Sequence, residues 1–146
     1  MTMPHERTRS LRWGHELLNL VAEDAALDAA VREQARRLLS TYPPPSEIAR
    51  WLAEDLPSLP ASAAVALGAA ADHFSKADLA NSASAETASV LLYTRRHYPL
   101  SGDFQVWANG NGRRSPREWL LPEDWYDSRL SAPSAQVTIA VPSDSR

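Results

Sequence analysis

The sequence has 146 residues, no cysteine, 15 basic and 18 acidic residues, and a formal net charge of −3. The lack of cysteine excludes disulfide scaffolds, thiol catalysis and cysteine zinc sites, and the slight negative charge argues against strong non-specific binding to nucleic acid. No apolar run approaches the ~18 residues of a membrane span, and no signal peptide is recognisable at the N-terminus. We therefore expect a cytoplasmic protein, most simply a single folded domain.

The first predicted element is an amphipathic helix that begins near Pro4 and runs for about five turns. We expect Thr2 to cap this helix and Glu6 to interact favourably with its positive N-terminal end. One side of the helix is apolar and the other is polar. The apolar side carries Leu11, Trp13, Leu17, Leu18 and Val21, and the polar side carries His5, Arg9, Arg12, Glu16 and Asn19.

Two shorter helices are predicted next. Asp28 is expected to cap the first of them, and the prolines at 43–45 end it, because proline lacks the amide hydrogen and clashes with the preceding turn. Ser46 is expected to cap the following helix, which stops at the proline-containing hinge 55–60. Residues 1–55 therefore predict a three-helix unit.

Residues 56–100 are rich in alanine and predict two further packed helices. In the first of these, over 61–74, the small side chains allow a neighbouring helix to approach closely. The polar stretch 81–86 separates the two helices, and Ser84 is expected to begin the second. Apolar residues at 90–93 cover every side of that second helix, which predicts that it is central in the fold.

Residues 101–146 predict a small irregular element rich in tryptophan and arginine. A strand-like run over 104–108 precedes two Asn-Gly pairs, which favours a short β-hairpin. A second pattern offers an alternative. The segments 42–51 and 98–107 share Tyr-Pro, an acidic residue five positions after the tyrosine, an apolar residue next, and tryptophan nine positions after the tyrosine. This similarity arises either by chance or from a duplicated module, and in the second case 104–107 is helical and the hairpin is wrong.

The opening of the chain carries a distinctive string, Thr-Met-Pro-His-Glu-Arg-Thr-Arg at 2–9 with Leu11 and Trp13 after it, and an arginine-rich helix that ends in Tyr-Pro at 42–43. These stretches resemble a family of small, uncharacterised proteobacterial proteins that open with a TMPxERTR-like string. The resemblance covers about a third of the chain and implies no activity. It implies a bacterial cytosolic protein carried on mobile DNA, a setting in which small proteins often bind host defence complexes, as anti-CRISPR proteins do.

No pattern typical of catalysis or metal binding is present. The chain has no G-x-S-x-G nucleophile motif, and the glycines at 109–114 lack the Gly-Lys-Ser/Thr ending of a phosphate loop. We therefore expect no catalytic residue, no metal, no cofactor and no enzymatic activity. The four histidines show no H-E-x-x-H or H-x-x-x-H spacing, and they are His5, His15, His73 and His97.

The main prediction is a non-enzymatic regulator or inhibitor that binds a protein partner through the segment 104–129. Tryptophan, tyrosine and arginine dominate the energetics of protein interfaces, and this segment carries three tryptophans, four arginines and one tyrosine. The candidate partner-binding residues are Trp107, Arg113, Arg114, Arg117, Trp119, Trp125 and Tyr126.

The alternative is a small DNA- or RNA-binding regulator that uses arginines of the first two helices, because guanidinium groups bind phosphates well. Acidic residues within one helical turn of most of these arginines weaken the alternative. A steep loss of affinity with salt would identify phosphate contacts. The candidate nucleic-acid-binding residues are Arg9, Arg12, Arg32 and Arg36.

Overall fold

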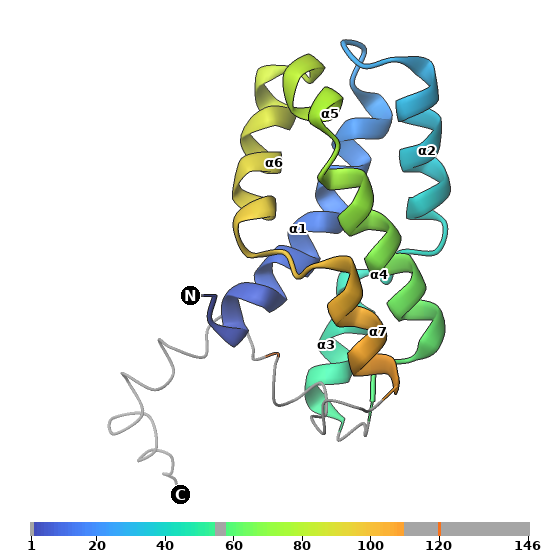
Figure 1. Cartoon of the computed structure of the whole chain (residues 1–146), viewed down its shortest axis with the longest axis vertical. Helices are drawn as coiled ribbons and strands as arrows, with labels where there is room; N and C mark the ends of the chain where they lie inside the picture. Colours follow the sequence, from blue (N-terminus) through green and yellow to red (C-terminus); the bar gives the residue numbers. More distant parts are fainter. Residues whose placement is uncertain (1, 55–57, 110–119, 121–146) are drawn as a thin grey trace, which may run out of the picture.

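The computed structural model describes residues 2–54, 58–109 and 120. In this part of the chain it has seven α-helices and no strand (Figure 1), so the prediction of a mainly α fold is confirmed. None of these helices is both long enough and apolar enough to cross a membrane. The helices are α1 (Pro4–Glu23), α2 (Ala29–Leu39), α3 (Pro45–Ala53), α4 (Ala61–Phe74), α5 (Ala77–Ser82), α6 (Ala85–His97) and α7 (Ser101–Asn109).

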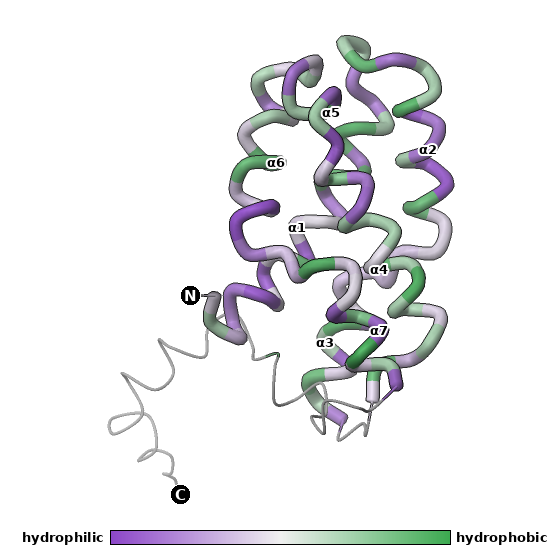
Figure 2. Tube along the Cα trace, in the orientation of Figure 1, coloured by the Kyte–Doolittle hydropathy of each residue, from purple (hydrophilic) through white to green (hydrophobic). Residues whose placement is uncertain are grey.

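The long helix α1 lies at the centre of the arrangement. Helices α2 and α6 pack along α1, α3 contacts it more briefly, and α7 packs against α4 (Figure 1). Hydropathy alternates along α1 and α2, as expected for helices with one buried side (Figure 2). The predicted apolar side of α1 is buried, except that Trp13 remains partly exposed. Residues of α1 with no exposed surface are Leu11, Leu17, Leu18 and Val21.

Two predicted helix caps are wrong. At the start of α1, the Glu6 carboxylate accepts a hydrogen bond from the Met3 backbone N–H at 2.7 Å, while the Thr2 hydroxyl lies 3.3 Å from Nδ1 of His97. Helix α3 begins at Pro45, one residue before the predicted cap Ser46. Proline is favourable in a first helical turn because its φ angle is already helical and its missing N–H would have no intrahelical partner.

The predicted strand over 104–108 is wrong, and the helical alternative is confirmed, because α7 covers this segment. The Asp103 carboxylate accepts a hydrogen bond from the Leu100 backbone N–H at 3.3 Å and caps the helix. Phe104 is fully buried and meets Trp107, one turn later, edge-on at 5.5 Å. This i, i+3 pair packs on the core only when the segment is helical. The return arm of the predicted hairpin lies outside the described residues.

The helices of the chain repeat at an interval of 56 residues, the separation of Tyr42 and Tyr98. Shifted by this interval, the bounds of α3 coincide with those of α7, and α2 starts where α6 starts. Helix α1 shifts onto α4 and the beginning of α5, a short helix that the sequence did not predict. The order and bounds of the helices therefore support the duplicated module, extended to three helices, although the packing differs: α2 packs on α1 of its own unit, whereas its equivalent α6 packs on α1 of the other unit. Pairs of equivalent residues that are buried in both units include Leu11 and Leu67, Leu18 and Phe74, Ala35 and Leu91, and Ile48 and Phe104.

The two units meet at a pair of tyrosines. The Tyr42 hydroxyl donates a hydrogen bond to the Leu11 carbonyl oxygen at 2.6 Å, and the Tyr98 hydroxyl donates one to the Leu67 carbonyl oxygen at 3.1 Å. Each bond spans 31 residues, so the two bonds are equivalent under the repeat. The two hydroxyl oxygens lie 3.2 Å apart. Burial raises the pKa of both phenols, so both stay protonated and able to donate.

Tyr42→Phe is expected to lower the free energy of unfolding by about 1–3 kcal/mol, because it removes the shortest of these buried hydrogen bonds. Urea titration followed by circular dichroism measures the change. Tyr93→Phe is the matched control, since Tyr93 is 49% exposed and a surface change of this kind costs at most about 0.5 kcal/mol. Equal stability of the two variants would contradict the role of the tyrosine pair.

Substitution by alanine is expected to change the stability of the protein in opposite directions at Gly14 and at Gly102. A Cβ atom at Gly14 would overlap the Tyr42 hydroxyl and lie 3.0 Å from the Tyr98 ring, whereas one at Gly102 would meet nothing within 4 Å. Gly14→Ala should therefore destabilise the protein by about 1–3 kcal/mol, and Gly102→Ala should stabilise α7 by about 0.5 kcal/mol because alanine favours the helix. Thermal unfolding of both variants tests the pair, and a stabilising Gly14→Ala would disprove the close approach.

Candidate protein-binding surface

Helix α6 begins at a well-defined cap. The Ser84 hydroxyl accepts a hydrogen bond from the Thr87 backbone N–H, and the Ser84 backbone N–H donates to Oδ2 of Asp24 at 2.8 Å. Asp24 follows directly after α1 and also accepts the Ala26 N–H through Oδ1 at 3.0 Å. One carboxylate therefore holds the end of α1, the turn after it and the start of α6 together.

The Asp24 carboxylate is charged at neutral pH. Burial raises the pKa of this carboxyl group, but the backbone N–H groups of Ser84 and Ala26 and the hydroxyls of Thr87 and Ser84 stabilise the charged form, so its pKa lies below the ordinary value. A charged acceptor forms stronger hydrogen bonds than a neutral one. The orientation of α6 on α1 is consequently fixed at its N-terminal end.

Helix α6 buries one side and exposes the other. Thr87, Leu91 and Thr94 point inward and are at most 2% exposed, whereas Leu92 is 61% exposed. The prediction that 90–93 makes this helix central is therefore wrong, because α1 covers α6 and α6 does not lie inside the fold. We call the outward side the α6 face. It consists of Glu86, Ser89, Leu92, Tyr93, Arg95 and Arg96.

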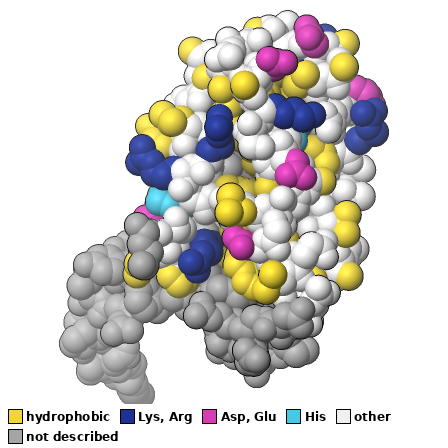
Figure 3. All heavy atoms as spheres, in the orientation of Figure 1, with side chains coloured by type: hydrophobic (Ala, Val, Ile, Leu, Met, Phe, Trp, Pro, Cys, Tyr) yellow, Lys and Arg dark blue, Asp and Glu magenta, His cyan; other side chains and the backbone are white. Residues whose placement is uncertain are grey.

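A hollow of about 630 Å³ borders the α6 face. Two alanines, Ala80 of α5 and Ala88 of α6, leave room beside the larger side chains. Four residues of α6 complete the lining, and with Ala88 they recur at the spacing of a single helix side. They are Leu91, Leu92, Arg95 and Arg96. In Figure 3, hydrophobic side chains lie next to basic ones over α6, on the left of the view.

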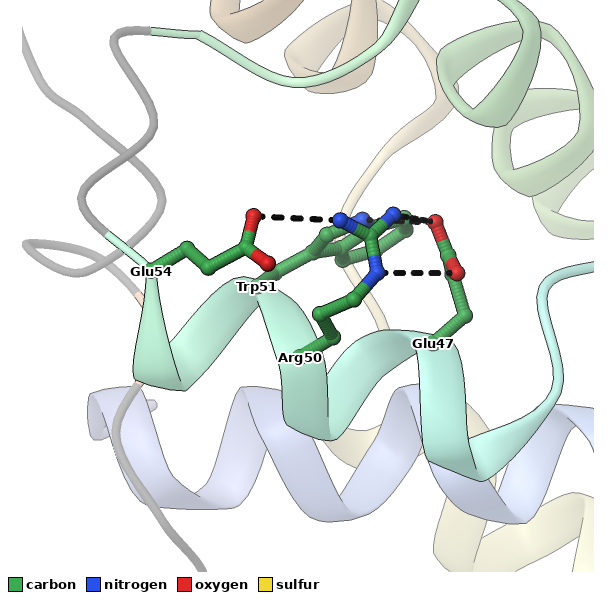
Figure 4. Close-up of polar contacts among 4 residues, drawn as sticks. All are labelled: Glu47, Arg50, Trp51 and Glu54. Atoms are coloured by element: carbon green, nitrogen blue, oxygen red, sulfur yellow. Dashed lines mark hydrogen bonds and ion pairs between the residues drawn. The ribbon is translucent and has the colours of Figure 1, made fainter.

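Other arginines in the described part of the chain are engaged by neighbouring groups. The guanidinium of Arg50 lies between Glu47 and Glu54 and binds both (Figure 4). The Arg50 contact, with a smaller contribution from the Trp51 indole N–H, lowers the pKa of Glu47 despite some desolvation. On α2, Glu33 pairs with Arg36 at 3.4 Å.

Arg95 and Arg96 differ from these arginines. Within residues 2–54, 58–109 and 120, neither side chain forms a hydrogen bond or an ion pair. Their place in the last turn of α6 is favourable, because cations stabilise the negative C-terminal end of a helix. Their donors nevertheless remain available to a ligand.

The repeat gives an internal comparison for the α6 face. Under the shift of 56 residues, Leu92 and Tyr93 take the places of Arg36 and Arg37 on α2. Those two arginines are exposed and share one acidic partner, Glu33, so the outer side of α2 is charged and partly neutralised. The same position in the second unit is apolar, although Tyr93 is partly covered by the edge of the Trp13 ring at 5.9 Å. A charged side chain is therefore compatible with this exposed position, and the fold does not require the apolar pair at 92–93.

Of the predicted partner-binding residues, Trp107 is described by the structure. It is partly buried on α7 and packs against the hydrophobic core, and its backbone carbonyl accepts a hydrogen bond from the Leu59 N–H at 3.3 Å. The remaining predicted residues lie outside the described part of the chain. They are Arg113, Arg114, Arg117, Trp119, Trp125 and Tyr126.

The four predicted nucleic-acid-binding arginines form two separate pairs, one near each end of α1. Arg36 donates to the Ala22 carbonyl oxygen at 2.9 Å, and Arg32 donates to the Leu27 carbonyl oxygen at 3.2 Å, so both are held near the C-terminal end of α1. Arg9 and Arg12 lie in the N-terminal half of α1 and are partly buried. Ten residues of helix, or about 15 Å, separate Arg12 from Ala22.

The residues that matter for this surface, Leu92, Arg95 and Arg96, were not identified from the sequence. The available signal was the contrast between the apolar pair at 92–93 and the arginine pair at the equivalent positions 36–37. No group of three potential metal ligands occurs among the residues that the structure describes. No known protein family, curated protein or solved structure matches this chain.

His73 is a buried titratable residue away from the α6 face. It is 1% exposed, and neither ring nitrogen has a hydrogen-bond partner in the described structure. Burial, with a smaller effect from the positive charge of Lys76, lowers the pKa of His73 to about 4. A side chain so enclosed has no access to a substrate.

The pKa of His73 predicts a loss of stability in mild acid. Because the folded-state pKa lies below the ordinary value of 6.5, the unfolded chain binds a proton that the folded chain does not as the pH falls below about 6.5. The contribution of His73 to stability is therefore fully present above that pH. Between pH 7.5 and pH 5, this residue should lower the free energy of unfolding by about 2 kcal/mol. Urea titrations at both values, compared with His73→Phe, isolate the effect. An equal pH dependence in the variant would contradict it.

Proposed function

We propose that this chain is a non-enzymatic regulator or inhibitor that acts by binding protein through the α6 face. The observation that carries the proposal is the exposed Leu92 beside a hollow whose rim bears two arginines without partners in the described structure. Interface cores bury apolar side chains, and arginine is favoured there because it forms several directed hydrogen bonds. The α6 face offers both kinds of residue on one rigid helix.

The comparison with α2 supports the same proposal. An exposed leucine by itself is ordinary on a protein surface. Here, however, the equivalent position in the other unit is Arg36, a charged side chain that is compatible with solvent and pairs with Glu33. Binding a partner would compensate for the exposure of Leu92 and for the uncompensated charge of Arg95 and Arg96.

The predicted binding segment 104–129 is not excluded by this proposal, and its contribution stays a prediction. Trp107 contributes to the packing of α7, so truncating it is expected to disturb the core as well as any interface. Leu92 is the better residue to change, because its side chain is mostly in solvent.

The test compares Leu92→Asp with Val65→Asp. Val65 is an exposed apolar residue of α4 with nearly the same exposure, 62% against 61%. Both variants should keep the wild-type free energy of unfolding within about 0.5 kcal/mol. Tagged full-length protein is used to capture partners from a bacterial lysate, half of it treated with nuclease, and bound proteins are quantified by mass spectrometry.

We expect protein partners that survive nuclease, that are captured by wild type and Val65→Asp, and that fall at least about tenfold with Leu92→Asp. Partners that Leu92→Asp captures as well as wild type does would reject the α6 face. Partners that vanish with nuclease, and are lost steeply with rising salt, would instead favour the nucleic-acid alternative.

A further inference from the structure

We infer that the partner of the α6 face is a protein segment that is both acidic and apolar, with a large apolar side chain in the hollow beside Ala88 and carboxylates on Arg95 and Arg96. This inference rests on the proposed function, because it uses the same surface, and it adds the chemistry of the partner. Three observations carry it: the order of residues along the hollow, the distribution of charge around α6, and a second hollow that Arg95 also borders.

The side of α6 that borders the hollow changes from apolar to basic towards the C-terminal end of the helix. Ala88 and Leu92 come first, and Arg95 and Arg96 follow in the last turn. Their spacing of three or four positions places them in a row along the helix. The axial distance from Ala88 to Arg95 is about 10 Å. A ligand that fills the hollow therefore meets the two guanidinium groups about two helical turns further along.

This side of α6 carries two positive charges and no acidic residue. Glu86, the acidic residue of the helix, precedes Arg95 by nine positions. At about 100° per residue, it lies on the opposite side of α6 and does not face the hollow. A carboxylate can accept two parallel hydrogen bonds from one guanidinium group. Carboxylates from a ligand would therefore supply the negative charge that this side of the helix lacks.

Arg95 also borders a second hollow, of about 310 Å³, at the C-terminal end of α6. Its lining includes Phe74, Tyr98 and Leu100, and the Leu100 side chain is 75% exposed. Asp72 of α4 belongs to the same lining but forms no ion pair with Arg95 in the described part of the chain. Because Asp72 repels a carboxylate, the acidic part of the ligand belongs at the first hollow, and an apolar side chain fits beside Leu100.

A protein segment fits this arrangement better than a nucleic-acid strand does. Among the described residues that line the first hollow none is aromatic, so nucleic-acid bases would find no ring there to stack on. The lining apart from the two arginines consists of alanine and leucine. Apolar side chains fill such a surface favourably, as they do in the cores of protein interfaces.

The experiment selects ligands for the immobilised full-length protein from random peptides displayed on phage, each about 16 residues long and so able to span both hollows. Wild type is compared with Arg95→Gln/Arg96→Gln. The matched control is Arg37→Gln, which removes an exposed guanidinium group from α2. Urea titration verifies that the variants are folded.

Wild type and the control should enrich peptides in which Asp or Glu lies about 10 Å from a large apolar residue. That distance corresponds to about three residues of an extended peptide or two turns of a helical one. The double variant should not enrich these peptides, and Leu92→Asp should not bind them.

Exchanging the charges provides the sharpest test. An enriched peptide is synthesised with its acidic residues and again with lysine in their place, and both forms are titrated by fluorescence anisotropy against wild type and Arg95→Glu/Arg96→Glu. The acidic peptide should bind the reversed variant at least about tenfold more weakly than wild type, and the lysine peptide should recover most of this loss. A purely structural role of the two arginines would not produce that recovery.

Three results would each overturn the inference: no enrichment, enriched peptides without acidic residues, and enriched peptides that bind Arg95→Gln/Arg96→Gln as tightly as wild type. If lysate proteins still depend on Leu92 in such a case, the inference alone fails and the proposed function stands. If Leu92→Asp also leaves capture unchanged, both fail. A single-stranded oligonucleotide that binds more tightly than any peptide, through Arg95 and Arg96 and with a steep salt dependence, would assign these arginines to phosphates and overturn the inference too.

Discussion

The contact between the hydroxyl groups of Tyr42 and Tyr98 fixes how the two halves of the chain meet. Each tyrosine follows the second long helix of its unit and reaches back to a backbone carbonyl of the first helix of the same unit. The two hydroxyl oxygens lie 3.2 Å from each other. Gly14 must lack a side chain there, because both rings lie against it. The positions of α1, α4 and α6 are therefore set by a few atoms at the centre of the molecule.

The same order of helices in the two units does not mean equivalent surfaces. The exposed charges of α2 pair within the helix through Glu33, and those of α3 pair through Arg50 and its two glutamates. In contrast, the α6 face combines an exposed leucine with arginines that have no partner in the described structure. The two units share the order of their helices and several buried positions, whereas the exposed residues of α2 and α6 differ in charge and polarity.

Much of the helical order could be predicted from the sequence, because prolines, alanines and apolar spacing act locally. The prolines at 43–45 end α2, and the apolar side of α1 is the buried one. Helix α5 was missed because its six residues include only one buried apolar side chain, Leu79. Helix α7 was uncertain because the alternation of Phe104 and Val106 resembles a strand. What favours the helix is the packing of α7 on the distant α4, with Phe104 and Trp107 on the same side of α7.

The α6 face could not be derived from local patterns for a related reason. Apolar residues at 90–93 surround the helix, and such a helix is normally buried on every side. Which side stays open depends on where α1 and α5 pack, and neither is specified by the residues of α6 themselves. The repeat contained the missing information, since Arg36 and Arg37 mark the equivalent positions as a place that faces water.

The separation of 56 residues between the two tyrosines also has a kinetic consequence. Contacts within one unit, such as that of α1 with α2, close short loops and can form quickly, whereas the meeting of Tyr42 with Tyr98 has to await both units. Until then the tyrosine hydroxyls and the carbonyl of Leu11 remain hydrated, and the space beside Gly14 stays open. Helix α6 packs mainly on α1 of the first half and not on α4 of its own, so we expect α6 to become ordered together with the tyrosine contact, as water leaves the two phenol groups.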